Sequence, residues 1–269
     1  MKVALGQLHL HWEDKEANLR VVEAYLELLA ENGTELFLLP EMSLTGFSMH
    51  TERIKEKSKE TISLIRALCE KYRMAAGVGW VKDSGTFCEN HYSIVTPQGE
   101  ILDSVKLHPF RFGGEAEHFQ GGDSLAVCDY GGFTIGVQIC YDLRFPEPFQ
   151  ILSKKADFIL VPANWPGARS GHWKCLLKAR AIENMVYVAG INCAGEIGDL
   201  FYSGDSRICA PDGTKLKKET FCLPGRCPEE QIQVYELQND VHRYRTCFPV
   251  KEDRREALYQ RLQEETQRL

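Results

Sequence analysis

Three side chains that could together perform acyl transfer each follow a predicted strand. Glu41 comes after the run LFLLP, Lys106 after ILDSV, and Cys140 after FTIGVQI. Acyl transfer needs a nucleophile, a proton acceptor and a positive group for the developing oxyanion, and these three residue types supply them. The pattern therefore predicts a thiol-dependent acyl-transfer enzyme with Cys140 as its nucleophile.

Cys140 lies where a predicted strand becomes a turn and then a helix. Polar Tyr141, Asp142 and Arg144 follow it at once, and Pro146 is typical of a first helical position. This order is similar to a nucleophile elbow, and a helix that begins at Pro146 would direct its positive end toward the thiol and favour a thiolate. A lone cysteine at a strand end is more often a packing residue, so the prediction depends on its partners.

Glu41 and Lys106 are the partners that the sequence offers. A carboxylate so close to the end of a buried strand is desolvated, which is expected to raise the pKa of Glu41 toward values useful for a general base. Lys106 stands directly before LHPF and would hold the oxyanion. The alternatives are a helix cap or loop ion pair for Glu41 and an ordinary surface position for Lys106.

The first part of the chain alternates strands with helices. Apolar runs and helical spacing, with Asp14 as an N-cap, predict strands at 3–9, 35–39 and 74–81 and helices at 14–31 and 58–72. The turn residues Pro97-Gln-Gly99 and Tyr130-Gly-Gly132 predict two antiparallel pairs, 92–96 with 100–105 and 124–128 with 133–139. The segment is therefore typical of an α/β protein.

The second part continues this order without a linker, repeat or low-complexity segment. It predicts a short helix from Pro146, strand 158–162, helix 170–185, strand 186–192, hairpin 203–211 with 215–218, strand 232–237 and a terminal helix over 251–269. Runs such as FILVP and VYVAGIN are typical of sheets covered on both faces, whereas hairpins require antiparallel pairs. We therefore expect one α/β domain with mixed sheets and helices outside.

The composition argues against several classes of protein. The formal net charge is −6 and the basic residues are scattered, which argues against a nucleic-acid surface. The chain begins without a secretory apolar segment, and no run approaches the roughly 18 apolar residues of a membrane span, so we expect a cytoplasmic protein. The ten cysteines show no spacing typical of a metal site, and we expect most of them to be free thiols.

Three separated motifs carry a resemblance to a known family. LPEMSLTGF, VKLHPF and ICYDLRFPE, in this order, resemble the nitrilase superfamily of carbon–nitrogen hydrolases, and the likeness spans nearly the whole chain. The resemblance implies a Glu-Lys-Cys triad at Glu41, Lys106 and Cys140, and a second glutamate that orients the lysine. Glu115 matches this glutamate better than Glu117 does.

The family also implies a fold, an assembly and a mechanism. The implied fold is an αββα sandwich, a single domain over 1–269 in which 241–269 is an extension used in subunit contacts of a homodimer or larger homo-oligomer. The implied reaction forms a thioester on Cys140, uses Glu41 as the base and holds the oxyanion with Lys106 and the backbone N–H of Tyr141. This reaction requires no metal and no cofactor.

The substrate is expected to be a small amide that carries a carboxylate. Arg144, four residues after the nucleophile, could bind that carboxylate, although pairing with Asp142 or Glu147 is an equal alternative. Phe47, Phe110 and Trp165 are candidate apolar walls. CYDLRFPE with NWPGARSGHW resembles the omega-amidase branch, which acts on 2-oxoglutaramate or 2-oxosuccinamate. Amidases of deaminated glutathione, carbamoyl amino acid hydrolases, nitrilases, an idle binding scaffold and a thiol redox sensor remain alternatives.

Overall fold

Two β-sheets form the centre of the molecule, and the computed structural model describes residues 1–266. The order of the first sheet is β14-β15-β1-β2-β3-β4-β5, with β6 added beside β4. Its strands are Glu219–Phe221, Gln231–Glu236, Lys2–Gln7, Leu36–Leu38, Ala75–Asp83, Cys88–Thr96, Gly99–Val105 and Phe119–Gln120. The order of the second sheet is β13-β10-β9-β8-β7, with strands Arg207–Cys209, Tyr187–Asn192, Phe158–Ala163, Phe133–Val137 and Val127–Tyr130. Both sheets mix parallel and antiparallel pairs.

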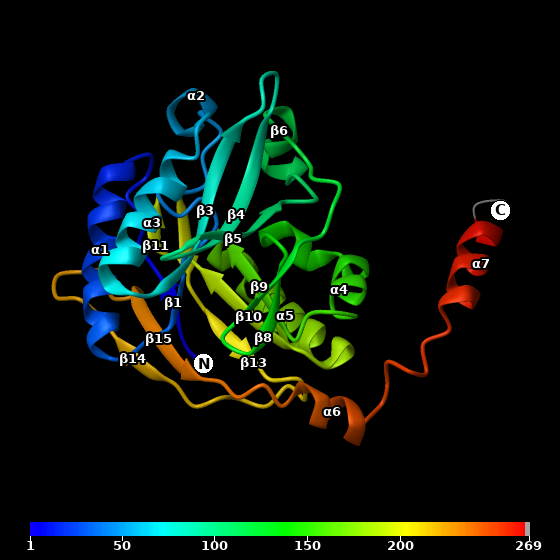
Figure 1. The fold of residues 1–269 in the computed structure, drawn as a ribbon. Helices are drawn as coiled ribbons and strands as arrows, with labels where there is room; N and C mark the ends of the chain where they lie inside the picture. The colour runs from blue at the N-terminus through cyan, green and yellow to red at the C-terminus, as the bar shows by residue number, and fades with distance from the viewer. Residues whose placement is uncertain (267–269) are drawn as a thin grey trace.

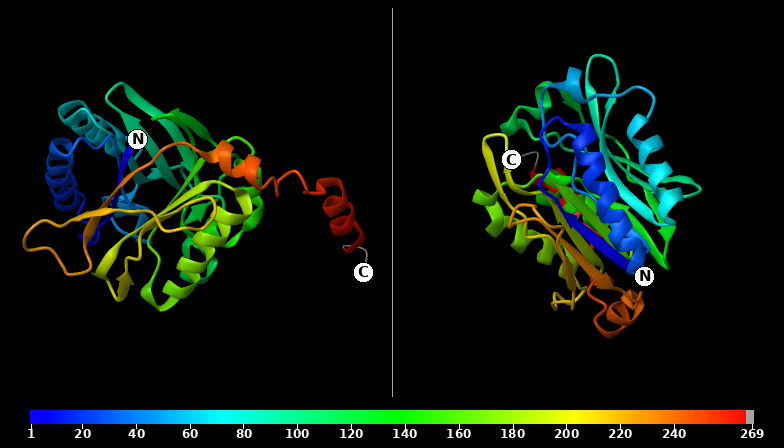
Figure 2. Two further views of the ribbon diagram at one scale, coloured as in Figure 1. Left: turned by 90° about the horizontal axis from the view of Figure 1, so that it is seen from below. Right: turned by 90° about the vertical axis from the view of Figure 1, so that its left-hand side faces the viewer.

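Helices cover the outer face of each sheet (Figure 1). Helices α1 (Lys15–Glu31) and α3 (Glu60–Tyr72) lie on the first sheet, and α4 (Pro146–Leu152) and α5 (Ser170–Asn184) lie on the second. Seen from below, the layers follow one another as helices, sheet, sheet, helices (Figure 2). The predicted αββα sandwich is therefore confirmed.

Alternate side chains of each central strand enter two different apolar layers. Val3 and Leu5 of β1 belong to the layer shared with the second sheet, whereas Ala4 belongs to the layer beneath α1 and α3. In β2, Leu36 and Leu38 face the first layer and Phe37 the second. Because successive side chains of a strand point to opposite faces, a fully apolar strand is explained by burial on both sides.

Most of the predicted elements are present with small shifts at their ends. Asp14 caps α1, because its carboxylate accepts a hydrogen bond from the backbone N–H of Ala17 at 2.9 Å. Pro146 occupies the first turn of α4, as predicted. The structure also contains short elements that were not predicted from the sequence. These include the helix α2 (Thr51–Ile54) and the hairpin β11–β12 (Ala194–Ile197 with Leu200–Ser203).

Two predictions about the last third were wrong. Instead of a hairpin of 203–211 with 215–218, β13 pairs with β10, and a single bridge joins Cys209 to Lys215. The turn at Gly213 forms, but the chain then crosses to the first sheet, where β14 pairs with β15. The terminal helix predicted for 251–269 begins only at Glu256, as α7 (Glu256–Thr266), and the helix α6 (Val241–Cys247) was not predicted. Residues 267–269 lie outside the described residues.

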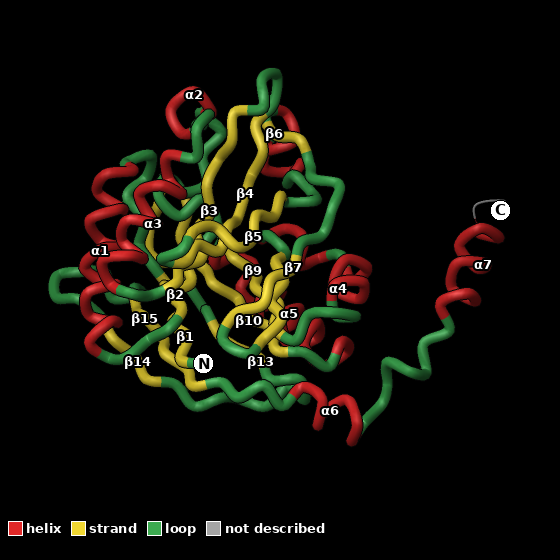
Figure 3. Tube along the Cα trace, in the orientation of Figure 1, coloured by secondary structure: helices red, strands yellow, loops and turns green. Residues whose placement is uncertain are grey.

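The C-terminal segment leaves the body of the molecule after α6. The tube in Figure 3 continues as a loop from α6 and ends in α7, which stands apart from both sheets. Tyr259 and Leu262 of α7 are exposed. Within residues 1–266, no helix is both long enough and apolar enough to cross a membrane.

Candidate active site

Glu41 is held at the end of β2 by a close approach of two backbones. The chain turns over β3 at Gly79, where an added Cβ would lie 2.4 Å from the backbone nitrogen of Met42. Only glycine leaves this space. Ser43 fixes the crossing, because its hydroxyl accepts a hydrogen bond from the Gly79 N–H at 2.7 Å. The Glu41 side chain is consequently fully buried.

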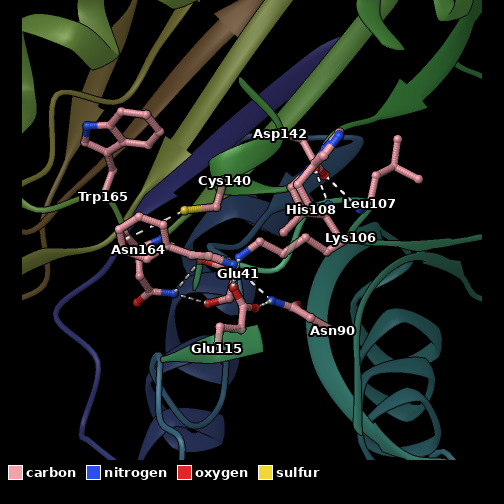
Figure 4. Close-up of polar contacts among 12 residues, drawn as sticks. Glu41, Asn90, Lys106, Leu107, His108, Glu115, Cys140, Asp142, Asn164 and Trp165 are labelled. Atoms are coloured by element: carbon pink, nitrogen blue, oxygen red, sulfur yellow. Dashed lines mark hydrogen bonds and ion pairs between the residues drawn. The ribbon is translucent and has the colours of Figure 1, made fainter. Parts of the chain in front are cut away.

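Lys106 lies between two buried carboxylates (Figure 4). Its Nζ donates to Oε1 of Glu41 at 2.8 Å and to Oε2 of Glu115 at 2.7 Å. Lys106 is 1% exposed and Glu115 is fully buried, whereas Glu117 is exposed. Asn90 joins the carboxylates by donating to Glu41 at 2.9 Å and to Glu115 at 3.1 Å. The structure thus brings Glu41, Lys106 and Glu115 into one hydrogen-bonded cluster.

Cys140 occupies a strained turn directly after the second sheet. Its φ is +48°, which is unusual for a residue other than glycine and typical of a side chain held for function. The residues Cys140–Arg144 form a 3-10 turn, so the predicted elbow is present, although this turn and not α4 begins at the thiol. Its Sγ lies 4.0 Å from the backbone carbonyl oxygen of Asn164.

Asp142 joins the cysteine turn to the lysine loop. Its carboxylate accepts hydrogen bonds from the backbone N–H groups of Ile139 at 3.0 Å, Leu107 at 3.2 Å and His108 at 2.9 Å. It also lies 2.7 Å from Nδ1 of His108. One buried side chain therefore sets the spacing between the elements that carry Cys140 and Lys106.

Replacing Asp142 with alanine is expected to loosen both elements. Because hydrogen bonds to a charged group each contribute roughly 1.5–3 kcal/mol, we expect the free energy of unfolding to fall by about 3 kcal/mol and kcat to fall with it. Denaturant titration and steady-state kinetics measure the two changes. Asp142→Asn keeps one acceptor oxygen and should lie between the wild type and the alanine variant. An alanine variant with wild-type stability would contradict the assignment.

The pKa of Glu41 moves in the direction opposite to the prediction. Burial alone raises the pKa, but the Lys106 ammonium and the N–H donors of Asn164 and Asn90 outweigh it, so the pKa of Glu41 is lowered. The expected thiolate is also wrong. Burial, with the charge of Glu41, raises the pKa of Cys140 well above its usual value. The resting site therefore holds a carboxylate beside a neutral thiol.

This charge state predicts the acid side of the pH profile. Because the pKa of Glu41 lies below its ordinary value of 4.5, kcat/KM should stay level from neutral pH down to about 5 and should decline only below that value. Initial rates measured across this range, with circular dichroism as the control for folding, test the prediction. An acid limb between about pH 6 and 7 would show that the pKa of the base is raised instead.

A cavity of about 340 Å³ opens over the thiol and contains every candidate pocket residue of the sequence prediction. Phe47, Phe110, Arg144 and Trp165 line it together with Lys106 and Cys140. Arg144 forms neither of its alternative ion pairs within residues 1–266; its guanidinium lies 4.8 Å from the centre of the Trp165 ring. The predicted catalytic and pocket residues therefore share one space.

Several residues of the site were not found from the sequence. Asn164 donates its backbone N–H to Oε2 of Glu41 at 3.0 Å and its side-chain amide to the Glu41 carbonyl oxygen at 2.7 Å. Asn90 and Arg169 were also missed. The position of Asn164 directly before Trp165 was a usable signal, whereas Asn90 lies in the polar start of β4, between Glu89 and His91, where nothing in the sequence distinguishes it.

The rim of the cavity is fixed by Glu13. Glu13 has a positive backbone φ of +57°. Its carboxylate accepts hydrogen bonds from Ser48 at 2.5 Å and Arg53 at 2.9 Å. It also lies 2.7 Å from Nδ1 of His50, a lining residue whose ring is tilted against that of Trp12, with 5.5 Å between the ring centres. Glu13 thus joins two loops that form one wall of the cavity.

The αββα sandwich and the buried cluster of thiol, lysine and carboxylates define a thiol-dependent enzyme that acts on carbon–nitrogen bonds. The family model described as carbon-nitrogen hydrolase matches residues 2–243. The chain belongs to the carbon–nitrogen hydrolase family.

Individual relatives cover almost the whole chain. The omega-amidase YafV of Yersinia enterocolitica is 37% identical over 94% of this chain and 96% of its own length. The 2-oxoglutaramate amidase of Bacillus subtilis (strain 168) is 30% identical over 94% of this chain and 97% of its own. Among solved structures, XC1258 from Xanthomonas campestris, a superfamily protein with an arsenic adduct in its active site, matches with a TM-score of 0.83 and 30% identity. The match covers 94% of this chain and 97% of that one.

Proposed function

We propose that this protein is an omega-amidase that hydrolyses the terminal amide of 2-oxoglutaramate or 2-oxosuccinamate and releases the 2-oxo acid and ammonia. The observation that carries the proposal is the cavity that Arg144 lines together with Cys140. A guanidinium that has no carboxylate partner can bind the carboxylate of such a substrate while the amide reaches the sulfur. The two named relatives support the same substrate class.

In the first half of the proposed reaction, Cys140 becomes acylated by the substrate. Glu41 takes the thiol proton as Sγ attacks the amide carbon, so the thiolate forms only together with the new bond. The Lys106 ammonium and the backbone N–H of Tyr141 hold the oxyanion. Burial lowers the pKa of Lys106, but the charges of Glu115 and Glu41 outweigh it and raise the pKa, which supports a cationic role. Glu41 then passes the proton to the leaving nitrogen, and ammonia departs.

In the second half, water replaces ammonia. Glu41 removes a proton from the water as its oxygen attacks the thioester carbon, and the collapse of the second tetrahedral intermediate releases the carboxylic acid and returns the proton to sulfur. Asn164 supports the positioning of both nucleophiles. Its backbone N–H donates to the Glu41 carboxylate and its side-chain amide donates to the Glu41 carbonyl oxygen, so Asn164 holds the base in place.

Ammonia release across a panel of amides tests the proposal. We expect 2-oxoglutaramate and 2-oxosuccinamate to give kcat/KM values at least about tenfold above those of carbamoyl amino acids and nitriles, because the omega-amides combine a carboxylate for Arg144 with a carboxamide for Cys140, whereas a carbamoyl group is a less electrophilic urea and a nitrile is not an amide. A higher value for a carbamoyl amino acid or for deaminated glutathione would assign the enzyme to that branch instead. No ammonia from any compound would contradict the amidase.

We further propose that the extension 241–269 contacts a second copy of the chain in a homo-oligomer. Its helix α7 stands away from both sheets (Figure 2). Tyr259 and Leu262 of this helix are exposed. An apolar helix surface without a partner is expected to be covered in an assembly. Light scattering of the full chain and of a chain ending at residue 240 measures the assembly. A full-length monomer would contradict this proposal and leave the amidase assignment intact.

A further inference from the structure

Two guanidinium groups, and not one, line the active-site cavity without a carboxylate partner. Arg169, the last residue of the 3-10 turn Gly167–Arg169, lines the same cavity as Arg144. Within residues 1–266 neither side chain forms an ion pair. Arg144 has only a 3.5 Å contact with Nδ1 of His172, and the Arg169 guanidinium makes no hydrogen bond. A partly buried guanidinium without a counter-charge is costly unless a ligand supplies one.

The other arginines of residues 1–266 do not share this property. Those without an ion pair are either exposed, as Arg73, Arg111, Arg243 and Arg255 are, or hydrogen-bonded to an amide, as Arg254 is to Gln150 at 2.6 Å. The remaining arginines form ion pairs with carboxylates. Arg144 and Arg169 are thus set apart, and both belong to the same cavity.

Aromatic rings hold the two guanidinium groups on one wall. Trp165 contacts both arginines, because the Arg144 guanidinium lies over its ring at 4.8 Å and its indole N–H donates to the Arg169 carbonyl oxygen at 2.9 Å. On the other side, the Arg169 guanidinium lies 5.7 Å from the ring centre of Phe110, and Arg144 lies 6.0 Å from that of Tyr141. The Phe110 and Tyr141 rings are 4.8 Å apart. Aromatic faces orient a cation without neutralising its charge.

The charges of the cavity select against an ammonium group. Its lining contains the cations Lys106, Arg144 and Arg169 but, among the described residues, no carboxylate. Lys106 forms ion pairs with both Glu41 and Glu115, whereas the two guanidinium groups have no carboxylate partner within residues 1–266. A substrate that carries both a carboxylate and a neighbouring oxygen acceptor suits this wall, and an amino acid with an ammonium at that carbon does not.

We propose that Arg169 is a specificity residue that, together with Arg144, binds the 2-oxo-carboxylate end of the substrate. Arg144 binds the carboxylate, and Arg169 donates to the 2-oxo oxygen and to the near carboxylate oxygen. The pair distinguishes 2-oxoglutaramate from glutaramate, which lacks the oxo group, and from glutamine, which carries an ammonium there. This inference rests on the proposed amidase function, and it assigns the part of the cavity that recognises the oxo acid.

Steady-state kinetics of Arg169→Ala on 2-oxoglutaramate, glutaramate and glutamine test the inference. We expect KM for 2-oxoglutaramate to rise about tenfold or more while kcat changes less than about twofold, because binding is lost and the thiol chemistry is not. KM for glutaramate should rise less than about threefold, because this compound has no oxo oxygen and loses only the contact of Arg169 with its carboxylate. Arg169→Lys should recover part of the affinity, because it keeps the charge but lacks the planar fork of donors.

A binding measurement separates this inference from the function on which it rests. Calorimetric titration with 2-oxoglutarate compares Cys140→Ala with the double variant that also carries Arg169→Ala. The dissociation constant of the double variant should be about tenfold higher than that of Cys140→Ala. An unchanged constant overturns the inference, and so does an equal rise of KM for 2-oxoglutaramate and glutaramate. A wild-type enzyme that releases no ammonia from 2-oxoglutaramate overturns the proposed function, while the titration still decides whether Arg169 binds an oxo acid.

Discussion

Replacing Cys140 with alanine is expected to lower kcat by at least about four orders of magnitude, because no other group in the cavity can form the acyl intermediate. The melting temperature should change little, since the approach of the thiol to the Asn164 carbonyl oxygen, at 4.0 Å, is a weak contact. Ammonia release measures the rate, and thermal unfolding measures the stability. Mass spectrometry of the wild type quenched during turnover should find the acyl group on the peptide that contains Cys140.

Cys193 provides the matched control for this experiment. Like Cys140 it is buried and follows a strand of the second sheet, and burial raises the pKa of its thiol well above the usual value. It does not line the cavity. Cys193→Ala should therefore lower the melting temperature while kcat stays near that of the wild type. If Cys140→Ala keeps its rate while Cys193→Ala loses it, the nucleophile has been assigned to the wrong strand end.

Replacing Lys106 with methionine should affect both catalysis and stability. Losing one donor to an oxyanion lowers kcat by about 10² to 10³, and here the loss also leaves Glu41 and Glu115 buried without their counter-charge. Breaking a buried ion pair on one side costs about 3–5 kcal/mol, so the free energy of unfolding should fall by a similar amount. Denaturant unfolding and ammonia release measure the two effects independently.

A double variant separates the two roles of Lys106. Adding Glu115→Gln to Lys106→Met removes one of the two uncompensated charges and leaves an amide that can still bond Asn90. Stability should then recover by about 2 kcal/mol, whereas kcat should remain as low as in the single variant. Turnover that recovers together with stability would mean that Lys106 acts only as a structural counter-ion. A folded Lys106→Met enzyme with wild-type kcat would exclude its role at the oxyanion.

The fold could be predicted where local patterns decide it. Helix α1 has helical spacing and an N-cap at Asp14, and β9 is a continuous apolar run, so neither depends on distant residues. The hairpin expected after Gly213 failed for the opposite reason. Its turn chemistry was read correctly, but the choice of partner for residues 215–221 depends on the free edge of β15, which no local pattern reveals.

The sequence predicted which residues form the site, but it did not predict their protonation states. The positions of Glu41, Lys106 and Cys140 after strands predicted the triad, and the resemblance to the family added Glu115. The pKa of Glu41 could not be predicted, because its sign depends on whether burial or the surrounding donors dominate. Three of those donors come from Lys106, Asn90 and Asn164, which lie far apart along the chain. Only the folded geometry brings them to the same carboxylate.

The chemistry of this protein is divided between its two sheets. The base and the lysine follow β2 and β5 of the first sheet, whereas Cys140 and Asn164 follow β8 and β9 of the second. A small slide of one layer over the other would separate nucleophile from base without breaking any strand pairing. The apolar layer between the two sheets contains Leu38 and Val137. Mutations at these residues should therefore abolish turnover while the chain is still folded. The rate of turnover therefore reports small changes in the alignment of the two sheets.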